Sequence, residues 1–312
     1  MKSAIVTGAT GFIGTWLVKE LSSNDIKVTA VVRQKTTNLI KIKDIPNVEV
    51  VICDMEDVDK LPEILHEKVY DVFYHLAWHG TSGDLRSDYE IQLTNVEITL
   101  KAMAAAEKLK CAKFVGAGSL MEFESHQVVM KDGIIPTVSS MYSIAKYTAH
   151  AMSKTYSSNI EIEHVWSYIT NAYGEDEISP RFFNTTIRKM LDREKLDFTE
   201  GNQLYDFVHV RDVARAFRLI GENGKKGCNY CIGSGNPKPL KDFIIMMGQI
   251  VDETLQMNFG AVASTGISLS ADIYSIESLK KDTGYEPLIS FDEGVKMVLK
   301  HMKEQIKGGK EW

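Results

Sequence analysis

The first half of the chain alternates short apolar runs with longer amphipathic segments. Residues 88–108 show the helical pattern clearly, because their apolar residues recur at spacings of three and four and so lie on one face. Those residues are Tyr89, Leu93, Val96, Leu100 and Met103. The apolar runs predict strands at 4–6, 27–32, 48–52, 72–76 and 113–115, and the amphipathic segments predict helices at 12–22, 88–108 and 140–156.

This alternation predicts a doubly wound α/β fold, since right-handed crossovers between strands build a parallel sheet that helices cover on both faces. From about Tyr173 onward the pattern loosens into loops, helices and short strands. The segments 163–169 and 206–213 look like strands that return to the sheet or its edge. We therefore predict a first domain over 1–172 that also receives strands from about 206–213. A smaller, interleaved lobe is predicted over 173–312.

The composition excludes several classes of protein. The chain has 312 residues, of which 44% are hydrophobic and 25% charged, and its net charge is -6. That charge argues against a nucleic-acid binder, which needs a basic face to neutralise phosphates. No apolar run approaches the roughly 18 residues of a membrane span, and residues 1–3 lead into a strand pattern without an export signal. We expect a cytoplasmic protein.

The cysteines do not indicate a disulfide scaffold or a metal site. There are 4 of them, and Cys228 and Cys231 form a lone Cys-x-x-Cys without a second pair or a nearby pair of histidines. They fall in a short predicted strand before the turn at 233–235. We expect buried or half-buried thiols in a reducing compartment, and no bound metal.

A glycine-rich turn follows the first predicted strand. Thr7-Gly8-Ala9-Thr10-Gly11-Phe12-Ile13-Gly14 connects that strand to the helix at 12–22. The first glycine permits a tight turn, the second lets the backbone approach a pyrophosphate, and the third lets helix and strand pack closely. The helix N-terminus offers free N–H groups and the positive end of its dipole. A structural turn without a ligand is the alternative. The strand–turn–helix context favours a dinucleotide site formed by Gly8, Thr10, Gly11, Phe12, Ile13 and Gly14.

The end of the second strand indicates which dinucleotide binds. Sites for NAD usually place a carboxylate there, against the ribose 2′-hydroxyl. This chain has Arg33, with Lys35 beyond it, and a guanidinium can bind a 2′-phosphate through two hydrogen bonds. We therefore favour NADP(H) over NAD(H). The alternative is that Arg33 is a solvated surface cation or stacks on the adenine.

Tyr142 and Lys146 lie four residues apart on a predicted helix and so share one face. A free phenol, with a pKa of about 10, is a poor base at neutral pH, and a nearby cation lowers that pKa. The preceding strand ends at Ser119, whose hydroxyl can hydrogen-bond a substrate oxygen and stabilise its developing charge. Ser119 is therefore a candidate partner of Tyr142 and Lys146.

The glycine spacing and the Tyr-x-x-x-Lys pair resemble the extended branch of the short-chain dehydrogenase superfamily. That branch contains nucleotide-sugar epimerases, dehydratases and ketoreductases. The resemblance covers nearly the whole chain and implies the triad Ser119, Tyr142 and Lys146. It also implies a homodimer through the helices at 88–108 and 140–156. Further positions that match the family's cofactor site are Asp54, Met55, Leu76, Ala77 and, as a support of the active-site backbone, Asn95.

Departures from the family's pattern narrow the reaction. The 4,6-dehydratases carry Asp and Glu after the catalytic Ser or Thr, whereas this chain has Leu120 and Met121, which have no transferable proton. Met121 also stands where an epimerase–reductase has an acid–base cysteine, which disfavours epimerisation at C3 or C5. Glu122 comes one position late, and we interpret it as a surface carboxylate or one that supports the site from behind.

The residues that would anchor a substrate also depart from the family. Tyr205 stands where the family has an arginine before Asp206, and Tyr168 replaces another. The diphosphate of a nucleotide sugar could be bound by Arg181, Arg188 or Arg211, each of which could equally be a surface charge. Trp78 could border the sugar, although tryptophan is more often buried in a core. We interpret His79 as structural or peripheral. The substrate-binding candidates are Trp78, Met121, Asn171, Arg181, Tyr205 and Arg211.

The sequence therefore favours an NADPH-dependent reductase of a nucleotide-linked 4-keto-(6-deoxy)hexose, with Arg33 as the reason for preferring reduction. An NAD-dependent nucleotide-sugar 4-epimerase is the first alternative. A non-catalytic dinucleotide-binding regulator is another, although such relatives typically lack the tyrosine and lysine. An enzyme of a non-nucleotide carbonyl compound is the third.

Overall fold

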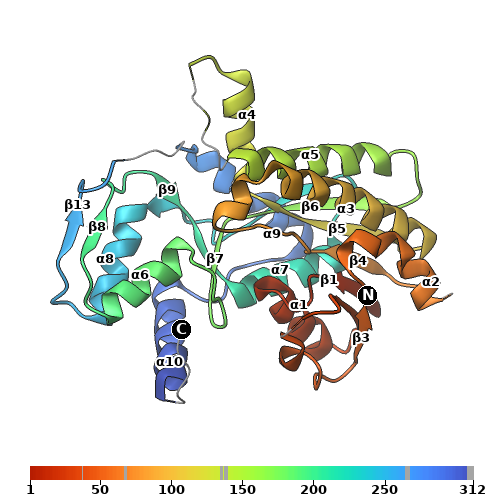
Figure 1. The fold of residues 1–312 in the computed structure, drawn as a ribbon, viewed down its shortest axis with the longest axis horizontal. Helices are drawn as coiled ribbons and strands as arrows, with labels where there is room; N and C mark the ends of the chain where they lie inside the picture. The colour runs from red at the N-terminus through yellow and green to blue at the C-terminus, as the bar shows by residue number, and fades with distance from the viewer. Residues whose placement is uncertain (37, 67–68, 134–135, 137–139, 264–267, 308–312) are drawn as a thin grey trace.

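A seven-stranded parallel sheet lies at the centre of the computed structural model, which describes residues 1–36, 38–66, 69–133, 136, 140–263 and 268–307. The strand order is β11-β6-β5-β4-β1-β2-β3, and every neighbouring pair is parallel. The strands are β1 (Ser3–Thr7), β2 (Lys27–Val32), β3 (Val48–Ile52), β4 (Val72–His75), β5 (Lys113–Ser119), β6 (Glu163–Ile169) and β11 (Asn229–Ile232). Helices cover both faces (Figure 1), so the fold is doubly wound α/β.

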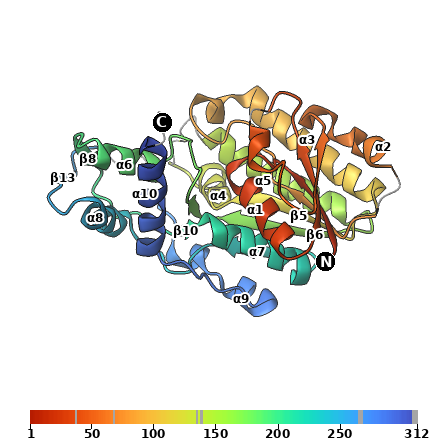
Figure 2. The same cartoon turned by 90° about the horizontal axis from the view of Figure 1, so that it is seen from below.

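Two helical layers enclose this sheet. On one face α1 (Phe12–Ser23) packs on α7 (Val210–Asn223), and on the other α3 (Tyr89–Lys108) packs on α5 (Ser140–Ser157) (Figure 2). Ala4 and Val6 of β1 belong to the core on the α1 side, whereas Ile5 belongs to the core on the α3 side. Because side chains alternate between the faces of a strand, this continuous apolar run is buried from both sides.

A smaller lobe with its own core stands beside the sheet (Figure 2). Its centre is a group of aromatic rings in which Phe243 lies 5.0 Å from Phe207 and 4.7 Å from Phe291 between centroids. The lobe contains α6 (Phe182–Leu191), α8 (Leu240–Val251), α10 (Phe291–Lys307) and the strands β8 (Leu196–Phe198), β9 (Leu204–Tyr205), β12 (Lys238–Pro239) and β13 (Met257–Phe259). The remaining helices and turns are η1 (Asn38–Lys41), η2 (Met55–Lys60), α2 (Leu61–Leu65), η3 (Asp84–Ser87), α4 (Glu122–Met130), η4 (Ala271–Tyr274) and α9 (Glu277–Thr283).

The strands and helices predicted for the first half are confirmed, with ends that differ by a few residues. The prediction that the segment 206–213 adds strands to the main sheet is wrong. Its extended part, β10 (Phe207–His209), pairs with β7 (Asn171–Tyr173) in a separate two-stranded sheet, and α7 begins at Val210. Phe207 is buried in the core of the lobe, which holds this strand away from the main sheet. The second half instead contributes β11, which pairs with β6.

Candidate active site

The site lies where the order of strands reverses, between β1 and β4. Chains that leave neighbouring strands in opposite directions open a crevice at the carboxyl ends of the strands, which is where α/β sheets of this kind bind ligands. Here Gly8 follows β1, and Leu76 and Ala77 follow β4. The catalytic candidate Ser119 ends β5, the next strand of the sheet. The sheet thus brings the predicted cofactor and catalytic residues to one edge.

The glycine turn leaves no room for a side chain at Gly8 or Gly14. Gly8 has φ +69°, and a Cβ there would lie 2.8 Å from the backbone nitrogen of Ala77. A Cβ on Gly14 would lie 2.0 Å from the carbonyl oxygen of Gly8, so the helix can approach the strand only without a side chain. Gly11 is the N-cap of α1 and makes no side-chain cap hydrogen bond, and the first turn holds no acidic residue. The N–H groups at this helix start are therefore available to an anion.

Around the end of β2 the side chains are mostly exposed. Arg33 and Lys35 are exposed, whereas the carboxylate of Asp54 accepts a hydrogen bond from the backbone N–H of Gln34 at 3.0 Å. Asp54 precedes Met55, the first residue of η2. The hydroxyls of Thr10 and Thr36 lie 3.3 Å apart and connect the glycine turn to the loop after β2.

Two buried polar residues, His75 and Asn95, support the loop that follows β4. His75 lies between the hydroxyls of Thr7 and Thr99, at 2.9 and 3.4 Å, and burial lowers the pKa of His75 to about 3, so the ring stays neutral. Asn95 accepts from the backbone N–H of His79 at 2.9 Å and donates to its carbonyl at 2.8 Å. Asn95 therefore fixes this segment of backbone, which is the role that the resemblance implies.

Tyr142, Lys146 and Ser119 come together around Trp78. The ring of Tyr142 is nearly buried and meets the indole of Trp78 edge-on, with centroids 6.1 Å apart. The Nζ atom of Lys146 lies 3.7 Å from the centroid of the same indole and donates a hydrogen bond to the carbonyl of Ala117 at 2.7 Å. The Ser119 side chain is close enough to Tyr142 to favour the ionised phenol, and its hydroxyl accepts from the backbone N–H of Met121 at 3.2 Å. The structure thus places the three predicted catalytic residues in one group.

The electrostatics of this group differ from the sequence-based expectation. Burial raises the pKa of Tyr142 above its ordinary value, and Arg181 and Arg86 oppose that rise. Burial also lowers the pKa of Lys146 to about 7. A lysine that is only partly charged is a weak stabiliser of a neighbouring phenolate. The cations that favour the ionised phenol are therefore two arginines, of which sequence reasoning named Arg181 only as an anchor for the substrate.

Glu122 lies behind the catalytic group and not on the surface. It is buried, and its Oε1 accepts hydrogen bonds from the backbone N–H of Ser119 at 2.8 Å and from the indole N–H of Trp166 at 3.0 Å. Its Oε2 is 3.2 Å from Nδ1 of His150, which is itself 3.2 Å from the hydroxyl of Tyr168. Of the two interpretations from sequence, the supporting carboxylate fits this arrangement. Tyr168 belongs to this network as well.

Arg86 and Glu124 are near the catalytic group, and sequence reasoning missed both. The guanidinium of Arg86 lies 4.6 Å from the ring centroid of Tyr142 and contacts the sulfur of Met121. Burial raises the pKa of Glu124 to about 7, while Arg86 lowers it. Neither residue stands in a motif, because one lies on a short turn and the other on a helix that the periodicity did not reveal. Only their positions in space identify them.

The other substrate candidates do not all lie beside the catalytic group. Tyr205 is half-buried and interacts electrostatically with Glu124 and Arg86, so it belongs beside the catalytic group. Arg211 instead forms an ion pair of 2.6 Å with Glu175 and lies 4.7 Å from the centroid of Trp16 on α1. Asn171 begins β7, where its backbone N–H donates to Asp206, and Arg188 lies on α6.

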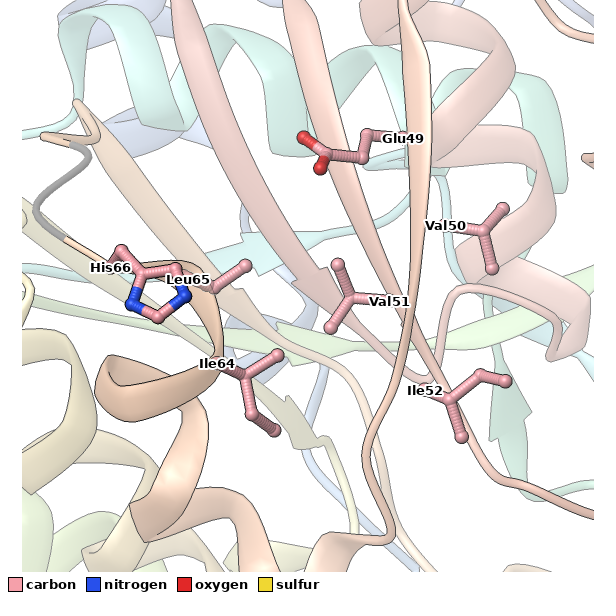
Figure 3. Close-up of a pocket in the computed structure, with 7 residues that line it drawn as sticks. All are labelled: Glu49, Val50, Val51, Ile52, Ile64, Leu65 and His66. Carbon is pink, nitrogen blue, oxygen red and sulfur yellow. The ribbon is translucent and has the colours of Figure 1, made fainter.

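A hollow of about 600 Å³ lies elsewhere, at the outer edge of the sheet (Figure 3). Residues of β3 and of α2 line it, together with His66. Ile52 and Ile64 in this lining are exposed, and none of the predicted site residues belongs to it. We do not assign the active site to this hollow, because Tyr142 and Lys146 come together elsewhere, around Trp78.

The residues that the structure describes include neither a metal cluster nor a membrane-spanning helix. No cluster of three or more His, Cys, Asp or Glu in that part of the chain has the arrangement of a metal site. None of its helices combines the length and hydrophobicity of a membrane span. Cys231 is buried and Cys228 half-buried, and burial raises the pKa of the Cys231 thiol to about 12.

Comparisons with known proteins agree with the site geometry. A family model described as "NAD dependent epimerase/dehydratase family" matches residues 4–233. A CDP-abequose synthase from Salmonella typhimurium is 26% identical over 307 residues, covering 96% of this chain and 97% of that protein. A putative UDP-glucose 4-epimerase from Methanocaldococcus jannaschii is 26% identical over 309 residues, covering 96% and 98%. The structure of a UDP-N-acetylglucosamine 4-epimerase from Methanobrevibacter ruminantium has a TM-score of 0.81 at 21% sequence identity. The match covers 97% of this chain and 99% of the epimerase. This last likeness concerns the fold.

Proposed function

Since the chain belongs to the NAD dependent epimerase/dehydratase family and is an enzyme of nucleotide sugars, we propose that it reduces a nucleotide-linked 4-keto-(6-deoxy)hexose with NADPH. The observation that carries this proposal is the grouping of Ser119 with Tyr142, in which Ser119 favours the ionised phenol. The two residues that follow Ser119 carry no transferable proton. Leu120 is buried in the core, and the sulfur of Met121 contacts Arg86. Such a site can hold and protonate a carbonyl oxygen but has no carboxylates at the positions that dehydration uses.

The residues of the site have distinct tasks in this reaction. Tyr142 donates a proton to the keto oxygen, and Ser119 donates a hydrogen bond to the same oxygen as charge develops on it. Lys146, with a pKa of about 7, can exchange a proton with its surroundings near neutral pH. Bound NADPH supplies the hydride that reaches the carbonyl carbon. The glycine turn at 8–14 would hold the pyrophosphate, and Arg33 would hold the 2′-phosphate.

The function is tested by following NADPH absorbance with a panel of nucleotide-linked 4-keto-6-deoxy sugars. We expect consumption of NADPH in proportion to the sugar added, with a hydroxyl formed at C4. The likeness to CDP-abequose synthase supports the proposal of reduction. Consumption with none of the sugars, in a protein that is folded and binds NADPH, would refute reduction.

A 4-epimerase is the second candidate, because the triad suffices for it and because the putative UDP-glucose 4-epimerase is equally similar to the chain. Epimerisation needs a retained dinucleotide and no net change of redox state. Tightly held NAD in the purified protein, together with conversion of a UDP-hexose without consumption of added cofactor, would favour this candidate over reduction.

Arg33 decides the cofactor in this proposal. We expect Arg33→Asp to weaken the binding of NADPH by roughly tenfold or more, since one charge-assisted contact is worth about 1.5–3 kcal/mol. The same substitution should strengthen the binding of NADH. The KM values of both cofactors measure this effect. Lys27→Asp is the matched control, because it makes the same change of charge at the exposed start of the same strand. Equal cofactor preference in the parent and in Arg33→Asp would contradict the assignment.

We also propose that the enzyme is a homodimer. Large apolar side chains are exposed on α3 and α5, which pack side by side: Tyr89, Leu93, Tyr147 and Met152. A second copy of the same face would bury them. Light scattering should give twice the 35.0 kDa of one chain, and a monomer at micromolar concentration would refute the dimer.

A further inference from the structure

Arg86 lies on a segment that is fixed to the neighbouring helix. It belongs to η3, and the side-chain nitrogen of Gln92 on α3 donates to the carbonyls of Gly80 and Leu85 at 3.1 and 2.9 Å. The same amide accepts from the indole of Trp78 at 3.0 Å. This loop and the indole beside Tyr142 are therefore positioned by one residue.

The guanidinium of Arg86 stacks on the catalytic phenol. Its central carbon lies 4.6 Å from the ring centroid of Tyr142, and a terminal nitrogen contacts the sulfur of Met121. A guanidinium over an aromatic face is attracted to the negative face of the ring. Met121 is therefore an uncharged side chain in contact with the guanidinium, at the position where a family member has a reactive cysteine.

The guanidinium of Arg86 is not fully satisfied by hydrogen bonds within the described part of the chain. Its Nε is buried without a hydrogen-bond partner in the described part of the chain. Glu124 on α4 interacts with it electrostatically, but burial raises the pKa of Glu124 to about 7, so this carboxylate is only partly ionised at neutral pH. The field of the guanidinium therefore remains available to the phenol.

The other groups around Tyr142 do not replace Arg86. They are Arg181 before α6, Glu122 on α4, Ser119 on β5 and Lys146 on α5. Arg181 is partly exposed, and its Nε lies 3.9 Å from Oε2 of Glu177. Glu122 opposes ionisation of the phenol. Lys146 donates to a backbone carbonyl and faces Trp78. Among these cations, Arg86 is the one in contact with the ring of Tyr142.

We infer that Arg86 is a positioning residue of the reaction: stacked on the ring of Tyr142 and supported by Met121, it orients the phenol and stabilises its ionised form. The inference rests on the proposed role of Tyr142 as proton donor. A phenol that loses its proton more readily is a better acid toward the keto oxygen. The prediction is therefore that Arg86 acts on the reaction through Tyr142 and not through a contact of its own with the sugar.

A double-mutant cycle tests this inference. Arg86→Gln, Arg86→Lys, Tyr142→Phe and the double variant Arg86→Gln/Tyr142→Phe are compared in single turnovers with whichever nucleotide sugar the parent converts. We expect Arg86→Gln to lower the rate of hydride transfer about three- to tenfold and Arg86→Lys to restore part of it, because lysine keeps the charge but not the planar guanidinium. In the Tyr142→Phe protein, Arg86→Gln should change the rate less than about twofold, since the group it acts on is gone.

The pH profile supplies a readout that a structural role would not move. In the direction of reduction, Tyr142 must be protonated, so the rate falls as pH rises through its pKa. Removing a cation raises that pKa, and the alkaline fall in kcat/KM should move upward by about one pH unit in Arg86→Gln. Arg193→Gln is the matched control, because it removes an equal charge from an exposed site paired with Asp252 in the lobe. Its profile should coincide with that of the parent.

The possible results separate the two proposals. If Tyr142→Phe is as fast as the parent, the proposed function fails, whatever Arg86 does. If Tyr142→Phe is slow but Arg86→Gln matches the parent in rate and pH profile, the inference about Arg86 alone is overturned. The inference would also be overturned if Arg86→Gln slowed the Tyr142→Phe protein by the same factor as it slows the parent. Arg86 would then act on the substrate directly and not through Tyr142.

Discussion

Replacing Tyr142 with phenylalanine is expected to slow the conversion of a nucleotide sugar by on the order of 10²- to 10⁴-fold, the usual contribution of a general acid. The substitution removes the phenolic proton, but it leaves the ring between Trp78 and Arg86. The change in kcat should therefore exceed any change in KM. Stopped-flow measurement of NADPH absorbance gives both values.

The control for this substitution lies on the same helix. Tyr147→Phe removes a hydroxyl from an exposed position of α5 and should leave kcat unchanged. The unfolding temperature of Tyr142→Phe should stay close to that of the parent, because the loss of at most one hydrogen bond costs about 1 kcal/mol. A Tyr142→Phe protein that keeps the parent's turnover would remove the basis for every step assigned to the phenol.

Replacing Gly14 with alanine is expected to weaken NADPH binding by about 100-fold or more. The new Cβ would lie 2.0 Å from the carbonyl oxygen of Gly8, so the turn and the start of α1 must move apart. Loss of two charge-assisted hydrogen bonds to the pyrophosphate, each worth at least about 1.5 kcal/mol, corresponds to that factor. Titration of NADPH fluorescence measures the affinity.

A helical glycine in the lobe provides the control for this effect. In Gly248→Ala, the nearest atoms to the added Cβ are the flexible ends of methionine side chains, mainly Met257 at 2.7 Å, so the change should be absorbed and NADPH affinity kept. Should Gly14→Ala fail to fold, Gly11→Ala offers a milder test, since its Cβ would lie 3.2 Å from the same carbonyl. Unchanged affinity in a folded Gly14→Ala protein would contradict the phosphate cradle.

The strands and helices of the sheet domain were predictable because their pattern is local. Strands such as β2 are buried on both faces and therefore read as continuous apolar runs, and α3 shows its buried stripe at helical spacing. The segment 206–213 was misjudged for the opposite reason. Its apolar residues are those of a strand, but whether Phe207 joins the main sheet or the aromatic core of the lobe depends on residues about 36 to 84 positions away, such as Phe243 and Phe291.

The sequence by itself determined the doubly wound fold, the glycine turn and the Tyr142–Lys146 pair, because each depends on a local pattern of residues, and the resemblance to the family added Ser119. The tertiary structure decided what surrounds the phenol. It brought Arg86 from a short turn and Glu124 from a helix to the same place as Tyr142, and it buried Lys146 enough to weaken its charge. The physical reason is that the pKa of a buried group depends on desolvation and on charges from distant parts of the chain, and spacing along the sequence carries no record of either.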